Sequence, residues 1–278
     1  MYPLLLLVSL TWAGSFIAIK IALNYLDPCN LAFYRFLIAT PIMLILFRPN
    51  LKIRLKDLPS LIILGLSGVT LLYVVQFTAL ELTTATKASI LINTSVIFTA
   101  ILSHIFLREG MNVRKILGIL IAFLGVFLVV SNGQINFTPN LGDLLMIFDG
   151  LLWAIYTVLG KAMLKSYRVE HLTTYAFALG TAMLFPFALS KGLANPFEMS
   201  LGAILSLLYL SILCSVFAYL AWYYALKALP ATNVAVFTYL IPLFTALLAY
   251  VLLKEEITMF TALGGILIVL GVYFVERD

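Results

Sequence analysis

Two ionisable residues, Asp149 and Arg35, lie inside long apolar segments of this 278-residue chain. A charged side chain at the centre of a membrane costs at least about 2.5 kcal/mol, so such residues usually face a cavity or the protein interior. At about 100° per helical residue, Asp149 shares a face with Trp153 and Tyr156, and that face is too polar for lipid. Asp149 is therefore predicted to bind a cationic group or a coupling proton. A structural hydrogen bond to a neighbouring helix is the alternative.

Arg35 lies near one end of the second apolar segment. Its planar guanidinium group can form two parallel hydrogen bonds with a carboxylate, which suits a residue that holds the carboxylate of a substrate. The alternatives are a structural tether to backbone carbonyls or to an acid such as Glu81, or a side chain that extends to the membrane interface.

Lysines, aromatic residues and neutral polar residues complete the set of candidates. Lys20 and Lys161 are either gating contacts at the two mouths of a transport path or lysines that extend to the interface. Trp12 and Phe16 lie one helical turn apart on the Lys20 face, where they either line a cavity or pack. The remaining candidates for substrate contact are deep-lying side chains with aromatic or polar groups: Trp153, Tyr156, Tyr73, Gln76, Asn93 and Tyr239.

Enzymatic chemistry lacks its usual residues. The sequence has two histidines and neither a His-Glu-x-x-His nor a Gly-x-Ser-x-Gly motif, which argues against metal and serine hydrolases. Asp143 and Asp149 project about 120° apart on one helix, so they could not easily share a scissile bond. Cys29 and Cys214 are isolated, so neither a disulfide nor a metal site is indicated. An intramembrane enzyme is disfavoured, and the alternative of a channel lacks ringed charges or a repeated filter sequence.

The composition is that of an integral membrane protein. Hydrophobic residues make up 63% of the chain and charged residues 10%, and the mean hydropathy is +1.11, whereas soluble domains carry about 25% charged residues. Helices are the expected spanning structure, because no segment alternates like a barrel strand and open strand edges would leave backbone groups unsatisfied in lipid. Ten spans are predicted, at residues 4–23, 31–47, 58–80, 88–107, 113–131, 141–164, 172–189, 201–226, 231–253 and 257–275.

Lysine and arginine are distributed unequally between the loops. Twelve basic residues lie on one side of the predicted membrane, four lie on the other, and Arg35 lies within a span. Basic loops stay cytoplasmic as a rule, which predicts a multi-pass protein of the cell membrane with both termini in the cytoplasm. The net charge of +5 suits anionic lipid headgroups better than nucleic acid, because the bases do not form one patch. The twelve are Arg48, Lys52, Arg54, Lys56, Arg108, Arg114, Lys115, Lys161, Lys165, Arg168, Lys227 and Arg277, and the four are Lys20, Lys87, Lys191 and Lys254.

The chain contains an internal repeat. Residues 79–129 recur without gaps as residues 225–275, with 16 identities in 51 aligned positions and an offset of 146. In the first spans of the two copies, Trp12 recurs as Trp153 with an offset of 141.

Each copy holds five predicted spans. An odd number of spans places the second copy upside down in the bilayer, and inverted repeats of this kind are a recurrent architecture of secondary transporters. The predicted fold class is therefore all-α integral membrane, with ten transmembrane helices as two inverted five-helix repeats. The repeats are predicted at residues 1–135 and 136–278.

Several short motifs follow the same order in the chain as in a known family. They are Trp12-Ala13, Phe16 and Lys20 in the first span, Arg35 in the second, Leu107-Arg108-Glu109 after the fourth, Gly142-Asp143-Leu144-Leu145 and Trp153-Ala154 in the sixth, Pro242 in the ninth, and Leu253-Lys254-Glu255 after it. Together they resemble the ten-span EamA-type members of the drug/metabolite transporter superfamily, over essentially the whole chain. The sequence departs from that pattern at Val96, which matches Pro242, and at Asp149, where small apolar residues are usual.

The resemblance implies a secondary active transporter that moves small metabolites, such as amino acids or related solutes, by alternating access. Export across the cytoplasmic membrane is the expected direction, with the substrate bound near the midplane of the bilayer. The resemblance is compatible with a coupling proton or sodium ion, and no cofactor is expected. Gly118 and Gly125, with Gly264 and Gly271, keep one helix face thin, which predicts either close helix packing or a homodimer surface.

Overall fold

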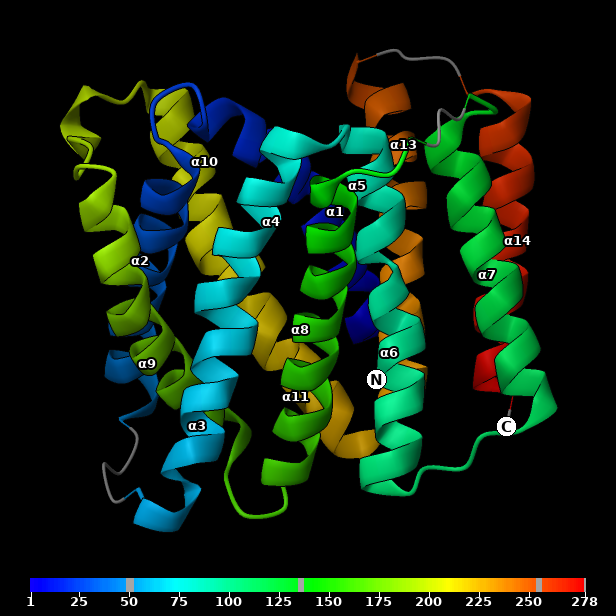
Figure 1. Cartoon of the computed structure of the whole chain (residues 1–278), viewed down its shortest axis with the longest axis horizontal. Coiled ribbons are helices and arrows are strands. Elements are labelled where there is room, and N and C mark those ends of the chain that lie inside the picture. Colours follow the sequence, from blue (N-terminus) through cyan, green and yellow to red (C-terminus); the bar gives the residue numbers. More distant parts are fainter. Residues whose placement is uncertain (49–52, 135–137, 254–256, 278) are drawn as a thin grey trace.

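The computed structural model describes residues 1–48, 53–134, 138–253 and 257–277, apart from the side chains of Phe16, Ala85, Thr86, Phe197, Leu252 and Leu253. Over these ranges the chain forms helices and helical turns, with no strand. Within the described residues, ten helical spans are long and apolar enough to cross a membrane, and they run between two ends of the molecule (Figure 1). The predicted all-α, ten-span membrane fold is confirmed.

Six spans are built on single long helices. These are the first, second, fifth, sixth, seventh and tenth spans: α1 (Tyr2–Ala22), α2 (Pro28–Phe47), α7 (Val113–Ser131), α8 (Leu141–Met163), α9 (Val169–Ser190) and α14 (Met259–Glu276).

Polar residues determine where several of these helices begin. Asp27 caps α2 by accepting a hydrogen bond from the backbone of Cys29 at 2.9 Å. The Asn112 side chain caps α7, and Asn140 and Asp143 form a reciprocal capping box at the start of α8. Such caps satisfy the backbone N–H groups that a helix leaves open at its first turn. All ten spans start and end within three residues of their predicted bounds.

The other four spans are interrupted, and the interruptions correspond in the repeated sequence. The third and eighth spans contain π-helical turns, η2 (Leu66–Thr70) and η5 (Ile212–Phe217), which start 146 positions apart. The fourth and ninth spans resume as α-helix at Thr94 and Leu240, which are also 146 positions apart. A π turn often marks a functional site within a helix.

The elements of these four spans are η1 (Leu55–Asp57), α3 (Leu58–Gly65), η2 and α4 (Leu71–Leu82) in the third; α5 (Ala85–Ile92), α6 (Thr94–Leu102) and η3 (Ser103–Leu107) in the fourth; α10 (Leu201–Ser211), η5 and α11 (Ala218–Ala228) in the eighth; and α12 (Ala231–Ala235), η6 (Val236–Tyr239) and α13 (Leu240–Leu253) in the ninth. A short turn, η4 (Pro196–Glu198), precedes the eighth span.

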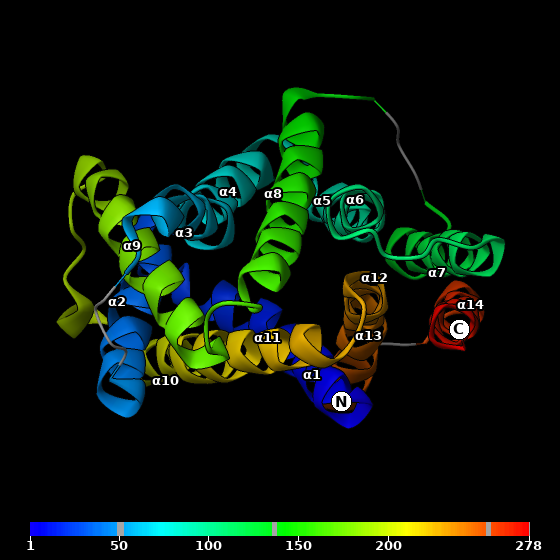
Figure 2. The same ribbon diagram turned by 90° about the horizontal axis from the view of Figure 1, so that it is seen from below.

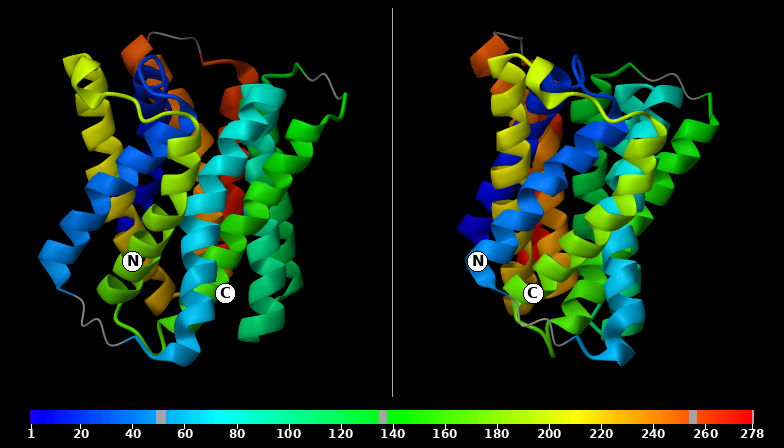
Figure 3. Two further views of the ribbon diagram at one scale, coloured as in Figure 1. Left: turned by 60° about the vertical axis from the view of Figure 1, so that its left-hand side comes forward. Right: turned by 90° about the vertical axis from the view of Figure 1, so that its left-hand side faces the viewer.

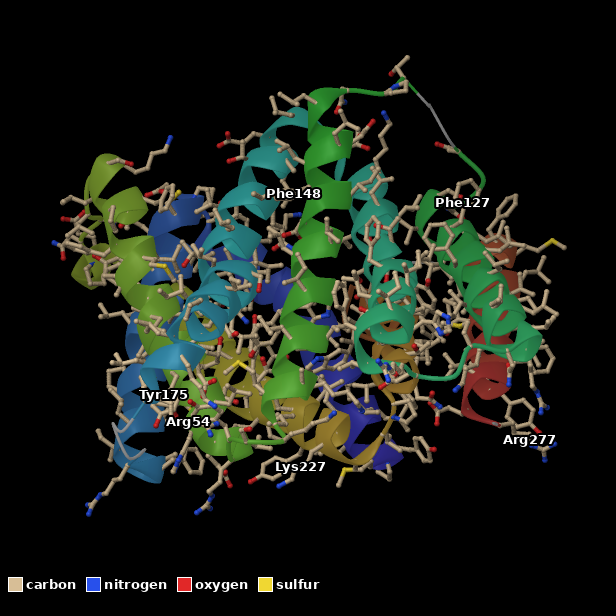
Figure 4. The ribbon with its side chains drawn as sticks, turned by 60° about the horizontal axis from the view of Figure 1, so that its bottom comes forward. Arg54, Phe127, Phe148, Tyr175, Lys227 and Arg277 are labelled. Carbon is tan, nitrogen blue, oxygen red and sulfur yellow. The ribbon has the colours of Figure 1, made fainter. Side chains whose placement is uncertain are left out.

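The basic loops gather at one end of the molecule, which we call the basic end. α2, η3, α8 and α11 all end there, whereas α1, α4, α7, α9 and α13 end at the opposite end (Figures 1 and 3). Figure 4 shows Arg54, Lys227 and Arg277 at the basic end, on three separate elements. α1 and α8, the first helices of the two halves of the chain, run in opposite directions between the two ends of the molecule (Figure 3).

α1, α8 and α11 lie near the middle of the long axis, while α7 and α14 pair at one extreme of it (Figure 2). The pair packs through its glycines, because a Cβ atom on Gly125 would lie 2.6 Å from the Gly264 carbonyl oxygen, and one on Gly271 would lie 2.5 Å from that of Gly118. Glycine allows such close helix contact. Of the two predicted uses of these glycines, the structure therefore uses them for packing within one chain.

Candidate functional site

Aromatic rings from both halves of the chain meet at the centre of the molecule. Trp12 of α1 lies with its ring centroid 5.4 Å from that of Trp153 of α8, 5.4 Å from Trp222 and 6.3 Å from Tyr219, both of α11. Tyr156, one turn along α8, stacks on Trp153 at 5.4 Å. Edge-to-face and stacked pairs at these distances are favourable. We call these five residues the aromatic cluster.

Arg35 reaches this cluster from α2. Its side chain is 5% exposed and donates hydrogen bonds from Nε to Ser215 Oγ at 2.6 Å and from Nη2 to the Cys214 carbonyl oxygen at 3.2 Å. The guanidinium carbon lies 4.8 Å from the ring centroid of Tyr73 and 5.3 Å from that of Phe36, so the cation is held between aromatic rings. Over the described residues, no carboxylate lies within ion-pair distance of it.

Asp149 is completely buried in α8. Gln76 of α4 donates a hydrogen bond from Nε2 to Asp149 Oδ2 at 3.2 Å, and Oδ1 has no hydrogen-bond partner in the described part of the chain. The break in the fourth span lies beside it, since a Cβ atom on the next residue, Gly150, would lie 2.9 Å from Thr94 Oγ1. Buried polar groups are normally hydrogen-bonded, so a carboxylate oxygen without a partner requires an explanation.

The third span links the two charged side chains. Tyr73 contacts Arg35 and Gln76 contacts Asp149, and these two residues of α4 are one helical turn apart, on one face. Tyr73 also shares a hydrogen bond of 3.2 Å with Tyr219, its counterpart at an offset of 146, and Tyr219 donates a further bond to the Gly68 carbonyl. Arg35, Asp149 and the aromatic cluster therefore form one continuous central site.

Most of the residues predicted from the sequence meet in this site, but Asn93 and Tyr239 do not. Asn93 donates a hydrogen bond to the Ser89 carbonyl within its own span. Tyr239 packs against Phe123 with a centroid distance of 6.2 Å, on the side of the molecule that α7 occupies. The Phe16 side chain lies outside the described residues.

Lys161 and Lys20 have different surroundings. Lys161 Nζ lies 3.3 Å from Glu109 Oε1 and donates hydrogen bonds to the carbonyl oxygens of Leu226, at 3.0 Å, and Leu229. Both Glu109 carboxylate oxygens accept from the Ala231 backbone at 2.8 Å. We call this set the Lys161 latch, because it ties the end of α8 to the η3 end and to the α11–α12 turn.

The latch lines a cavity of about 270 Å³ at the basic end, together with Lys165 and Lys227. The Lys20 side chain, in contrast, is exposed and bonds to no other described residue. Lys20 lies at the end of the molecule opposite the basic end. A cavity of about 90 Å³ lies at that end, between Asp27, Glu81 and Lys191. Of the two lysines, Lys161 bridges separate helices, as a gating contact would.

The sequence analysis missed Tyr219, Trp222 and Ser215. All three lie in the eighth span, whose apolar sequence resembles that of any buried helix. The repeat could have found two of them, because Tyr219 and Trp222 are the counterparts of Tyr73 and Gln76 at the same offset of 146. No such signal exists for Ser215, since its counterpart is Val69.

A scan against protein-family models matches the EamA-like transporter family at residues 1–131 and 140–277. The chain therefore belongs to the EamA-like transporter family. It is a multi-pass membrane transporter, with a small molecule as its expected cargo, and not an enzyme.

The names of similar proteins agree with the assignment as a transporter. An uncharacterized transporter of Archaeoglobus fulgidus is 53% identical over 276 residues, covering 97% of this chain and 95% of the relative. A second from the same organism is 35% identical over 266 residues, covering 96% of this chain and 95% of the relative. The probable terminal-alkyne amino-acid exporter of Streptantibioticus cattleyicolor is 27% identical over 278 residues, covering 98% of this chain and 92% of that protein.

One solved crystal structure superimposes with a TM-score of 0.83 at 18% sequence identity, over 98% of this chain and 95% of the other. This similarity supports the fold alone.

Proposed function

We propose that this transporter is a secondary active carrier that exports amino acids or closely related zwitterionic metabolites across the cell membrane by alternating access. The observation that carries the proposal is the pair of buried ionisable side chains at the centre, neither of which has a partner of opposite charge among the described residues. Arg35 and Asp149 pair neither with each other nor with any other charged side chain among the described residues. An isolated buried charge is unfavourable, and a partner of opposite charge removes much of that penalty.

A zwitterion would supply both partners at once. Its carboxylate would accept hydrogen bonds from the Arg35 guanidinium group, whose Nη1 bonds to no described residue. Its ammonium group would donate to Asp149 Oδ1. The aromatic cluster would enclose the rest of the molecule, as apolar walls do in most small-ligand sites. The name of the Streptantibioticus relative, an amino-acid exporter, supports the same class of substrate.

We further propose that the two halves are inverted repeats and that their relative motion exposes the site to each side in turn. Two pairs of repeat counterparts touch each other at the centre, Trp12 with Trp153 and Tyr73 with Tyr219. Residues related by a two-fold axis meet only where that axis passes, so these contacts support a pseudo-two-fold axis through the site. The matching interruptions of the third and eighth spans and of the fourth and ninth spans agree with it.

On this proposal the basic end faces the cytoplasm, because basic loops are retained there. The Lys161 latch would then close the cytoplasmic mouth in the present conformation and open when substrate enters from the cytoplasm.

Transport by purified protein in liposomes tests the proposal. The liposomes are loaded with a mixture of labelled proteinogenic amino acids, and efflux and counter-exchange are measured with and without a pH gradient. We expect saturable counter-exchange of at least one amino acid, which a channel would not give. Replacing Asp149→Asn or Arg35→Gln should reduce its rate roughly ten- to hundredfold, because each variant loses a charge-assisted hydrogen bond to the substrate.

Phe148→Leu is the matched control, since Phe148 precedes Asp149 in α8 and its side chain is 43% exposed. Unaltered exchange by both charge variants would exclude the central site as the substrate site. Absence of exchange for every amino acid would reject the substrate class.

A further inference from the structure

The π turn of the eighth span, η5, lies against two side chains of the first half of the chain. A π turn displaces the regular backbone hydrogen bonds of a helix and so leaves carbonyl oxygens open to other donors. The Cys214 carbonyl oxygen is used in this way, because it accepts from Trp12 Nε1 at 3.1 Å and from Arg35 Nη2 at 3.2 Å. The turn thereby holds one aromatic and one charged residue of the central site.

Ser215, the next residue, holds the guanidinium group of Arg35 at a second point. Its hydroxyl donates to the Leu210 carbonyl at 3.0 Å, which turns the oxygen lone pairs away from its own helix. Arg35 Nε donates to that oxygen at 2.6 Å. With Nε bound to Ser215 and Nη2 bound to Cys214, one edge of the planar group is fixed and the edge that carries Nη1 remains for a ligand.

A hydroxyl at the position of Ser215 is not needed to build such a turn, since in η2 the bond to the carbonyl five residues earlier comes from the next residue, Thr70, at 3.3 Å from the Gly65 oxygen. The corresponding turn of the third span, η2, has Val69 at the position of Ser215 and forms the same kind of π helix. Val69 packs against Gly180, the counterpart of Arg35 at an offset of 145. A serine at position 215 therefore corresponds to the presence of Arg35 opposite it and not to a requirement of the backbone.

We propose that Ser215 is a positioning residue for transport, which orients the Arg35 guanidinium group so that its remaining edge meets the carboxylate of the substrate. This assignment rests on the proposed function, in which Arg35 binds that carboxylate. Arginine has a long side chain with several rotatable bonds, and fixing it before the substrate arrives removes part of the entropic penalty of binding.

Counter-exchange in proteoliposomes tests the assignment with three variants: Ser215→Ala, Ser215→Thr and the matched control Ser211→Ala. Ser211 lies one turn earlier in the same span, is equally buried, and bonds its own helix at the Leu207 carbonyl, 2.7 Å away, without contacting Arg35. The probes are the labelled amino acid that the unaltered protein exchanges and the carboxamide analogue of that amino acid.

We expect Ser215→Ala to raise the KM for the amino acid about five- to tenfold and to leave the maximal rate within about twofold. Ser215→Thr should restore the KM, because it keeps the hydroxyl, and Ser211→Ala should not change it. The KM for the carboxamide should be the same in Ser215→Ala as in the unaltered protein, because that analogue has no carboxylate for Arg35. In an Arg35→Lys background, Ser215→Ala should have no further effect, since lysine lacks the Nε donor.

Three results would overturn the assignment. One is a KM in Ser215→Ala that matches Ser211→Ala while the unaltered protein exchanges the amino acid, which refutes the positioning role alone. Another is an equal rise for the amino acid and its carboxamide. The third is exchange of no amino acid by the unaltered protein, which rejects the proposed function and this assignment with it.

Discussion

Arg35 and Gly180 occupy matching places in the second and seventh spans, yet one carries the largest polar side chain of the central site and the other carries none. Each faces a π turn of the other half of the chain: Arg35 meets Ser215 of η5, and Gly180 meets Val69 of η2. The same contact between elements is thus polar in one place and closely packed in the other.

The first and sixth spans show a similar contrast between an apolar and an ionisable residue at matching positions. Asp149 matches Val8 at an offset of 141, and both are almost completely buried. The two halves share a scaffold, whereas the charged residues occur once each, Arg35 in the first half and Asp149 in the second. A substrate that contacts both charges must therefore lie between the halves.

The largest effect should come from giving the sixth span the residue of its counterpart. Asp149→Val should abolish measurable counter-exchange, because it removes the group expected to bind the substrate cation, and it should leave the protein folded, because valine is tolerated at Val8. Counter-exchange and thermal unfolding in detergent measure the two effects separately. Retained exchange would show that Asp149 is no more than a packing residue, like Val8.

Adding a side chain at Gly180 tests the closely packed member of the pair Arg35 and Gly180. Gly180→Val should lower the unfolding temperature clearly, since a Cβ atom at Gly180 would collide with Val69 and would lie 2.9 Å from the Gly65 carbonyl oxygen. Overpacking of this kind costs about 1–3 kcal/mol. Gly202→Val is the control, because a Cβ atom there meets nothing closer than 3.9 Å. Equal stability of the two variants would contradict the close packing of α9 on the third span.

The two lysines give a third comparison. Lys161→Gln should loosen the basic end, because it removes the ion pair with Glu109 and the bonds to two carbonyls. Leu164, which lines the cavity there and is 7% exposed, can be replaced by cysteine in a Cys29→Ser background. Modification of the cysteine introduced at position 164 by an impermeant maleimide should be about three- to tenfold faster in the Lys161→Gln variant than in the protein that keeps Lys161.

Glu109→Gln should act in the same direction and more weakly, since the amide still accepts from the lysine. Lys20→Gln should leave the modification rate at the basic end unchanged or lower it. A faster rate in Lys20→Gln than in Lys161→Gln would mean that the latch does not hold that end closed.

Much of the fold could be predicted from the sequence, because bilayer thickness fixes the length of a span and lysine and arginine mark its ends. The interruptions could not be predicted. The segment Leu66–Thr70 has no proline, and its Ser, Gly and Thr residues do not by themselves indicate a π turn. The turn becomes intelligible only beside the Tyr156 ring, which occupies the space where a Cβ atom of Gly68 would lie. Helix irregularities of this kind depend on tertiary contacts that local sequence does not record.

The candidate site was predictable to a similar degree. Arg35 and Asp149 stand out in the sequence because a charge within a span is conspicuous. Their uncharged partners do not, and the bond from Arg35 to Ser215 joins residues 180 positions apart. The partner of Lys161 was likewise hidden, since Glu109 follows a different span.

The smallest expected effect concerns the one pair of tyrosines that the repeat makes equivalent. Tyr73 and Tyr219 share a hydrogen bond, but only Tyr219 also donates to the Gly68 carbonyl in η2. Tyr219→Phe should therefore slow counter-exchange more than Tyr73→Phe, by about threefold against less than twofold, because it leaves a buried carbonyl without its donor. Parallel measurements of exchange and unfolding temperature on both variants check this order. Equal effects would mean that the shared bond, and not the bond to η2, is what the site requires, and that the two halves behave symmetrically at their centre.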